Sequence, residues 1–148
     1  MTSESALAGL AAQLAPWLCV GDVITLQGEL GAGKTAFARA LINALSPLPE
    51  EVPSPTFTLV QVYDAQTPEI WHFDLYRLEK EEDILELGWE EAKRHAALLV
   101  EWPQRLGGLL PSDRLEIDIT FDKYSENARF VTLTPFGVWQ DRLKGLTP

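Results

Sequence analysis

The sequence has little cysteine and few basic side chains. Its single cysteine, Cys19, cannot form an intrachain disulfide or build a thiolate metal cluster. The chain has 12 lysines and arginines against 22 aspartates and glutamates, for a net charge of -10. Because phosphate contacts dominate the affinity of proteins for nucleic acids, this balance disfavours autonomous binding of RNA or DNA. The acidity is typical of a soluble protein, and it would also suit a basic protein partner.

Long apolar runs are absent as well. No run of about 18 consecutive apolar residues occurs, and the N-terminal segment carries Glu4 but no basic cluster, so we expect neither a membrane span nor a secretory leader. We therefore predict a cytoplasmic protein. At 148 residues, 46% of them hydrophobic and with no internal repeat, the chain is expected to form one domain, residues 1–148, around one core.

The stretch GELGAGKT, residues 28–35, has the pattern of a phosphate-binding P-loop. It follows a short apolar segment, residues 22–27, that predicts a buried strand. A strong helix former, residues 36–45, comes after it. Strand, glycine-rich loop and helix in this order are the context in which the pattern binds phosphate.

Each residue type in this loop has a chemical use. Gly28 and Gly33 allow a tight turn whose backbone N–H groups point at an anion, and the following helix adds partial positive charge. Lys34 supplies a charge for the terminal phosphates, and the Thr35 hydroxyl is placed to bind Mg²⁺. The dinucleotide pattern GxGxxA, starting at Gly31, is an alternative that we disfavour, because the first glycine and the Lys-Thr pair occupy P-loop positions.

Two apolar segments downstream contain a carboxylate where a strand is expected to end. Residues 69–78 contain Asp74, and residues 96–103 contain Glu101. P-loop folds keep a second metal-holding group at such a strand end, so both acids are candidates, and spacing does not choose between them. His72 is expected to be a satisfied strand side chain rather than a metal ligand.

Hydroxyl side chains gather at the end of the proline-rich segment 46–55 and just after it. Ser54, Thr56 and Thr58 suit a loop that senses a γ-phosphate or its metal, as switch loops do. The plainer interpretation is the turn-forming entry to a strand over residues 56–63. Trp102 is open to two interpretations, a core side chain or part of the nucleotide pocket.

The remaining segments complete the predicted fold. Segments with helical spacing are residues 5–18, residues 79–94 with an interruption at Gly88, and residues 137–146. Alternating residues 115–121 and 130–134 predict an antiparallel hairpin with its turn over 122–127. We predict an α/β, P-loop NTPase-like fold: a mainly parallel sheet flanked by helices, with a C-terminal antiparallel extension.

Missing motifs narrow the function. No Asn-Lys-x-Asp stretch follows to recognise guanine, and no Asp-x-x-Gly switch follows the loop, which favours adenine. No obvious kinase lid with paired arginines is present, although Arg94, Arg105 and Arg114 keep that alternative open. The residues alone therefore leave two hypotheses, an ATP-driven switch and a small-molecule kinase, with the switch favoured.

Four motifs in order sharpen the choice. GELGAGKT, VPSPTFTLVQVY, HFDLYRL and VEWP together resemble the bacterial TsaE family, formerly YjeE, over nearly the whole chain. The resemblance implies a cytoplasmic protein that binds ATP or ADP with Mg²⁺, hydrolyses ATP weakly alone and works with the TsaB and TsaD proteins. In that system TsaD transfers threonylcarbamoyl to N6 of the adenosine beside the anticodon, in tRNAs that read codons starting with A. Contact with tRNA would then be indirect.

The resemblance also implies roles for particular residues. Glu101, together with the Thr35 hydroxyl, would bind Mg²⁺, and Asp74 would orient water or the hydration shell of the metal. Thr56, within the segment 54–56, would sense the γ-phosphate. The family's phosphate-binding loop falls on Gly31, Ala32, Gly33, Lys34, Thr35 and Ala36.

Two departures from the family affect the nucleotide site. Many members have a second threonine where this chain has Ala36, so a hydroxyl contact is lost there while the backbone N–H remains. Members also often begin with an extra strand before the first helix, and this chain starts almost at that helix. An edge of the sheet or of the pocket near Ser3 is then expected to be less complete.

Overall fold

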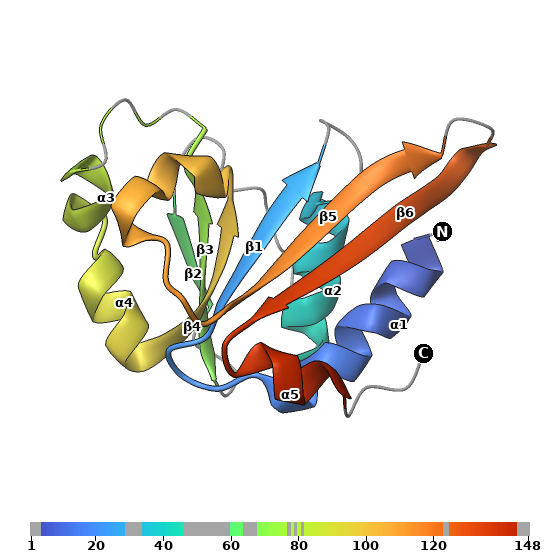
Figure 1. Ribbon diagram of the computed structural model, residues 1–148, viewed down its shortest axis with the longest axis horizontal. Coiled ribbons are helices and arrows are strands. Elements are labelled where there is room, and N and C mark those ends of the chain that lie inside the picture. The colour runs from blue at the N-terminus through green and yellow to red at the C-terminus, as the bar shows by residue number, and fades with distance from the viewer. Residues whose placement is uncertain are drawn as a thin grey trace.

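The computed structural model describes residues 4–28, 34–45, 60–63, 68–76, 78, 80, 82–122 and 125–144, with the backbone alone at residues 4–8, 35 and 121–130. A six-stranded sheet with helices on both faces forms the molecule (Figure 1). In chain order its elements are α1 (Glu4–Leu14), η1 (Ala15–Trp17), β1 (Val23–Gly28), α2 (Lys34–Leu45), β2 (Val60–Tyr63), β3 (Glu69–Asp74), α3 (Glu82–Glu86), α4 (Trp89–His95), β4 (Ala96–Glu101), η2 (Pro103–Leu109), β5 (Arg114–Asp122), β6 (Ser125–Phe136) and α5 (Trp139–Lys144).

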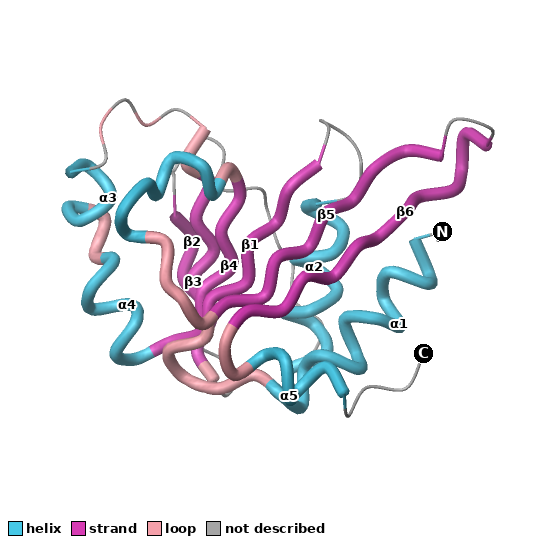
Figure 2. The backbone as a smooth tube through the Cα atoms, in the orientation of Figure 1, coloured by secondary structure: helices cyan, strands magenta, loops and turns pink. Residues whose placement is uncertain are grey.

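The strand order of the sheet is β2-β3-β4-β1-β5-β6 (Figure 2). The four inner strands are parallel, and β6 pairs antiparallel with β5, which confirms the predicted C-terminal extension. The other edge is also antiparallel, because β2 pairs with β3 in that sense. The connecting residues 64–68 are too few for a parallel crossover, which needs about a dozen residues.

Two apolar cores lie on the two faces of the sheet. Residues of α1, α2 and α5 pack on one face with Ile24 and Leu26 of β1, and residues of α3, α4 and η2 pack on the other with Val23. All six residues of β4 are buried. Near-continuous burial is typical of a parallel strand covered on both sides, and it places β1 and β4 at the centre of the molecule.

The first helix is shorter than the sequence predicts. The expected helix 5–18 ends at Leu14, and a 3₁₀ turn containing Pro16 follows. Proline lacks a backbone N–H and clashes with the preceding turn, so an α-helix does not continue through it. The interruption at Gly88 is confirmed: this glycine has a φ of 93° and separates α3 from α4.

The C-terminal hairpin is tighter than the sequence predicts. The turn expected over residues 122–127 is wrong, because Asp122 already pairs with Ser125. Ladder pairing satisfies backbone groups that a longer turn would leave to water. A last helix is present as α5, and no helix in the described part of the chain is long and apolar enough to cross a membrane.

Candidate functional site

The carboxyl ends of the parallel strands meet at the edge of the sheet where α2 begins. β1 ends there at Gly28, between β4 and β5. The chain leaves β1 toward α2 on one face, and it leaves β4 toward η2 on the other. Connections that leave neighbouring strands on opposite faces open a crevice at the carboxyl ends, where α/β proteins bind ligands. This crevice is the candidate functional site.

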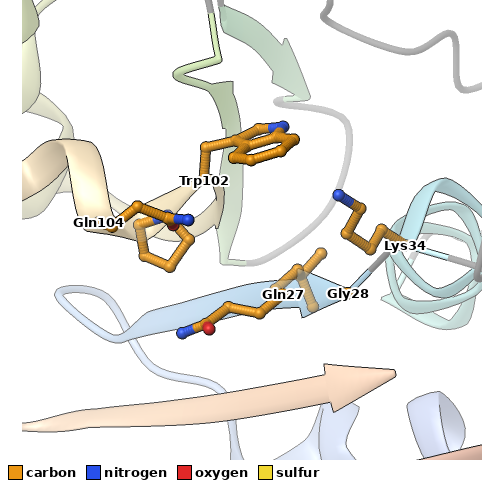
Figure 3. A pocket seen from close by; sticks show the side chains of 7 residues that line it. Gln27, Gly28, Lys34, Trp102 and Gln104 are labelled. Carbon is orange, nitrogen blue, oxygen red and sulfur yellow. The ribbon is translucent and has the colours of Figure 1, made fainter. Parts of the chain in front are cut away.

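A small cavity occupies the crevice, with a volume of about 80 Å³ (Figure 3). Its walls come from the end of β1, the first residue of α2 and the segment that enters η2. The lining residues are Leu26, Gln27, Gly28, Lys34, Trp102, Pro103 and Gln104. The cavity therefore joins the two motifs GELGAGKT and VEWP, which are far apart in the sequence.

Gly28, the first glycine of the predicted loop, has a structural reason to be glycine. Its φ is 152°, and a Cβ placed on it would lie 2.2 Å from the carbonyl oxygen of Ile119 on β5. Gly28 and Ile119 are register partners at the end of the β1–β5 ladder. Only a residue without a side chain allows this approach, so the backbone leaves β1 directly beside β5.

Lys34 is the first residue of α2 and is only 7% exposed. Its Nζ lies 4.8 Å from the centroid of the Trp102 ring, toward which the side chain points (Figure 3). Among the described residues no carboxylate forms an ion pair with this ammonium group. Burial of a charge without a counterion is costly, and a cation–π contact offsets only part of that cost. An anion in the crevice would offset more of it.

Trp102 follows β4 in a left-handed backbone conformation, with φ 63° and ψ 53°. This conformation is unusual for a bulky residue and turns the chain sharply into η2. The Trp102 ring contacts both Lys34 and Tyr76, and its centroid is 4.7 Å from that of the Tyr76 ring. Both interpretations that the sequence left open hold in part: Trp102 packs half-buried against the core on one face of the sheet, and it also lines the cavity.

The two candidate acids lie side by side at the same edge. Asp74 ends β3, Glu101 ends β4, and the two are register partners. Glu101 is also the register partner of Leu26 on β1, so it stands next to the loop-bearing strand, whereas Asp74 is one strand further away. By strand alternation both share a face with Leu99, which packs in the core beside α2.

Both acids are almost fully buried, at 5% exposure for Asp74 and 4% for Glu101. An Asp74 carboxylate oxygen, Oδ1, accepts a hydrogen bond from the Tyr76 N–H at 3.1 Å. The Glu101 backbone carbonyl accepts one from the Leu75 N–H at 3.2 Å. The first bond stabilises the turn after β3, and the second holds that turn against the end of β4.

His72 contacts Glu101 in a way that the sequence did not predict. Its Nε2 lies 2.7 Å from Glu101 Oε2, and its side chain is fully buried. His72 precedes Asp74 by two residues, and alternation in a strand places both on one face. The two-residue spacing in the sequence indicates that His72 and Asp74 share a face of β3. It does not indicate that β4, which carries Glu101, is the neighbouring strand.

The oxygen donors fit Mg²⁺. This ion prefers oxygen ligands and is commonly bound through one or two carboxylates together with phosphate and water. Glu101 and Asp74 supply two carboxylates at the edge where Lys34 and the N-terminus of α2 provide positive charge. Within the described ranges no group of three or more His, Cys, Asp and Glu residues is arranged to hold a metal.

Several predicted site residues lie outside the described part of the chain. These residues are Gly31, Ala32, Gly33 and Thr56. Thr35 is described as part of the helical backbone of α2, without its side chain, and Ala36 is a half-buried residue of the same turn. Of the described site residues, the structure places Gly28 and Lys34 in the wall of the cavity. It places Asp74 beside Glu101 at the neighbouring strand ends, and neither acid is among the residues that line the cavity.

Comparisons with known proteins agree with these motifs. The family model described as "Threonylcarbamoyl adenosine biosynthesis protein TsaE" matches residues 1–130. The tRNA threonylcarbamoyladenosine biosynthesis protein TsaE of Rickettsia conorii is 40% identical over 119 residues, which cover 80% of this chain and 68% of the relative. The protein of the same name from Bacillus subtilis is 38% identical over 117 residues, 79% of this chain and 72% of the relative.

A solved structure shares the fold of this chain. The crystal structure of YdiB from Bacillus subtilis superposes with a TM-score of 0.79 at 28% identity, covering 97% of this chain and 88% of that one. Because the superposition covers 97% of this chain, the likeness is not limited to one motif. With the family model matching residues 1–130 and relatives at 38–40% identity, the chain belongs to the TsaE family of threonylcarbamoyl adenosine biosynthesis proteins.

Proposed function

We propose that this protein binds ATP or ADP with Mg²⁺ in the crevice and hydrolyses ATP slowly, in support of threonylcarbamoyl transfer to tRNA. The observation that carries the proposal is the buried Lys34 at the first turn of α2, beside Gly28 and close in the fold to the end of β4. A buried ammonium group at a helix N-terminus is suited to an anion, and the loop between Gly28 and Lys34 has the P-loop pattern.

Each residue has a distinct task in this proposal. The loop backbone between Gly28 and Lys34 surrounds the phosphates, and Lys34 neutralises charge on the terminal ones. The Thr35 hydroxyl and Glu101 would hold Mg²⁺, which when bound would neutralise charge on the β- and γ-phosphate oxygens. Asp74 is proposed to orient water, and Thr56 to respond to the γ-phosphate.

The proposed partners are proteins of the TsaB and TsaD kind, acting in the cytoplasm. A net charge of -10 disfavours binding of tRNA by this protein alone, so the partner proteins would bind the tRNA. Because the same charge favours encounter with basic protein surfaces, it supports a role within a complex.

The first experiment tests the phosphate site. We expect Lys34→Ala to weaken ATP affinity in a calorimetric titration by about 10- to 150-fold, the equivalent of losing a charge-assisted contact of about 1.5–3 kcal/mol. Lys144→Ala is the matched control, because that side chain is 78% exposed on α5. Unchanged ATP affinity in Lys34→Ala would contradict the proposal.

The second experiment assigns the metal ligand. Glu101→Gln should abolish the effect of Mg²⁺ on nucleotide affinity, since an amide is a poor ligand for this ion. Asp74→Asn, the neighbouring isosteric change, should leave that effect in place and slow phosphate release instead. If Asp74→Asn abolished the Mg²⁺ effect and Glu101→Gln left it in place, Asp74 and not Glu101 would be the metal ligand.

The third experiment concerns the partners. Phosphate release from ATP should be slow with the protein alone and should change when TsaB, TsaD and tRNA are added. A rate that is indifferent to those proteins but rises with a small-molecule acceptor would favour a kinase. If the protein binds nucleotide but does not turn over ATP under any of these conditions, the nucleotide site would have a structural role only.

A further inference from the structure

The imidazole of His72 is the side-chain group in hydrogen-bonding contact with the Glu101 carboxylate. His72 lies on β3 opposite Leu99 of β4, and Glu101 is two residues beyond Leu99 on the same face. The Nε2 to Oε2 distance is 2.7 Å, the short range of hydrogen bonds to charged acceptors. Exposure is 0% for the His72 side chain and 6% for that of Glu101, so water competes little for this bond.

The direction of this hydrogen bond follows from the chemistry of the two groups. An ionised carboxylate only accepts, so Nε2 of His72 carries the hydrogen and donates it to Oε2. The other ring nitrogen, Nδ1, is buried and has no hydrogen-bond partner among the described residues. A buried polar atom without a partner is costly, so packing alone does not account for an imidazole at this position. Its bond to Glu101 is the stabilising contact.

We propose that His72 is a positioning residue that holds Oε2 of Glu101 and so leaves Oε1 as the oxygen for Mg²⁺. This inference rests on the proposed Mg²⁺-dependent nucleotide site. Outer partners that orient a metal ligand typically contribute 10- to 100-fold to metal affinity. Without the Nε2 donor, the Glu101 side chain would sample other rotamers, and part of the binding free energy would be spent on fixing it.

The decisive measurement is the Mg²⁺ concentration that half-saturates the enhancement of ADP binding in calorimetric titrations. His72→Leu fills similar space without a donor and should raise this concentration by about 10- to 100-fold. His72→Gln places an amide N–H near the position of Nε2 and should return it to within about threefold of wild type. ADP affinity without metal should be the same in all three proteins, because the phosphate contacts are unchanged.

ADP affinity without metal separates positioning from a structural effect. Damage to the packing of β3 against β4 would weaken ADP binding with and without Mg²⁺, whereas loss of positioning should weaken only the Mg²⁺ response. Circular dichroism and thermal melting of each variant confirm that it is folded. If His72→Leu fails to fold, the comparison of His72→Gln with His72→Asn, whose shorter amide cannot reach Oε2, carries the same test.

The outcomes distinguish the two proposals. A wild-type Mg²⁺ response in His72→Leu, or in His72→Asn if that pair is used, refutes the positioning role while leaving the proposed function intact. Failure of folded His72→Gln to restore the response also refutes it. If the wild-type protein itself shows no Mg²⁺ effect on nucleotide binding, both proposals are wrong.

Discussion

Replacing Gly28 with alanine tests the close approach of the end of β1 to β5. The new Cβ would meet the Ile119 carbonyl oxygen at 2.2 Å and the carbonyl carbon at 3.2 Å. Because real Cβ contacts essentially never fall under 3.0 Å, the gap must widen from 2.2 Å to at least that distance. The contacted atoms are backbone, so no side-chain rotation relieves the clash. β1 and β5 must separate at this register pair.

The energetic effect has two parts. A non-glycine residue at a φ of 152° adds backbone strain of about 1–3 kcal/mol. Disturbing the end of the β1–β5 ladder adds about 1 kcal/mol for a weakened hydrogen bond. We therefore expect Gly28→Ala to lower the free energy of unfolding by about 2–4 kcal/mol and the melting temperature by roughly 5–15 °C.

Urea unfolding followed by circular dichroism measures this change, with the m-value as a check that the transition remains two-state. Gly9→Ala is the matched control: Gly9 is exposed on α1, and a Cβ there meets nothing within 4 Å. The control should be more stable than wild type by about 0.5–1 kcal/mol, because alanine favours a helix over glycine. A Gly28→Ala protein within about 0.5 kcal/mol of wild type would refute the steric reasoning.

Two further predictions concern buried and half-buried acids. Asp22→Ala should lower the free energy of unfolding by about 1.5–3 kcal/mol in urea titrations, because Asp22 Oδ2 accepts bonds from Cys19 N–H and Arg142, both at 2.7 Å. Burial alone would lower the pKa of Arg142, but the hydrogen bond and charge of Asp22 raise it overall, which agrees with a tight pair. Asp118→Asn should stabilise the protein by a few tenths of a kcal/mol at neutral pH, because burial, and then the Glu116 charge, raise the pKa of Asp118.

The pH dependence of Asp118 has a definite sign. A raised pKa means that the folded state holds this proton more tightly than the unfolded state, so stability falls as the pH rises through the interval above the ordinary pKa of 3.8. The advantage of Asp118→Asn should therefore disappear below that value. Asp141→Asn serves as the control for both acids, since its side chain is 89% exposed. An advantage that persists at low pH, or Asp22→Ala as stable as Asp141→Asn, would contradict the respective argument.

Local patterns in the sequence were sufficient to predict most of the helices and strands. The apolar segment before GELGAGKT, the helix former after it and the alternation over residues 115–121 each depend on neighbours within a few positions. They predicted β1, α2 and β5 with small errors at the ends. Pro16 is also a local signal, and it explains why the first helix is shorter than its spacing predicts. The chemistry of the loop also follows from residue types, since glycine, lysine and threonine have few alternative uses in that order.

Strand order was decided only by the tertiary structure. Asp74 and Glu101 are equivalent in the sequence as acids that end apolar strands, and only the pairing of β4 with β1 places Glu101 next to the loop-bearing strand. The resemblance to the family implies that Glu101 is the Mg²⁺ ligand, and that role stays a prediction. Local periodicity cannot distinguish the two acids, because it shows which face of a strand a residue occupies but not which strand lies beside it.

The same limit applies to the contacts that give the site its shape. His72 contacts Glu101, which lies 29 residues later in the chain. Gly28 packs against the backbone of Ile119 on the neighbouring strand, and no sequence motif links these two residues. The sequence by itself determined the type of fold, the phosphate-binding pattern and the set of candidate acids. The tertiary structure decided which acid stands beside β1, what holds it and why Gly28 has no room for a side chain, because these depend on long-range packing and strand register.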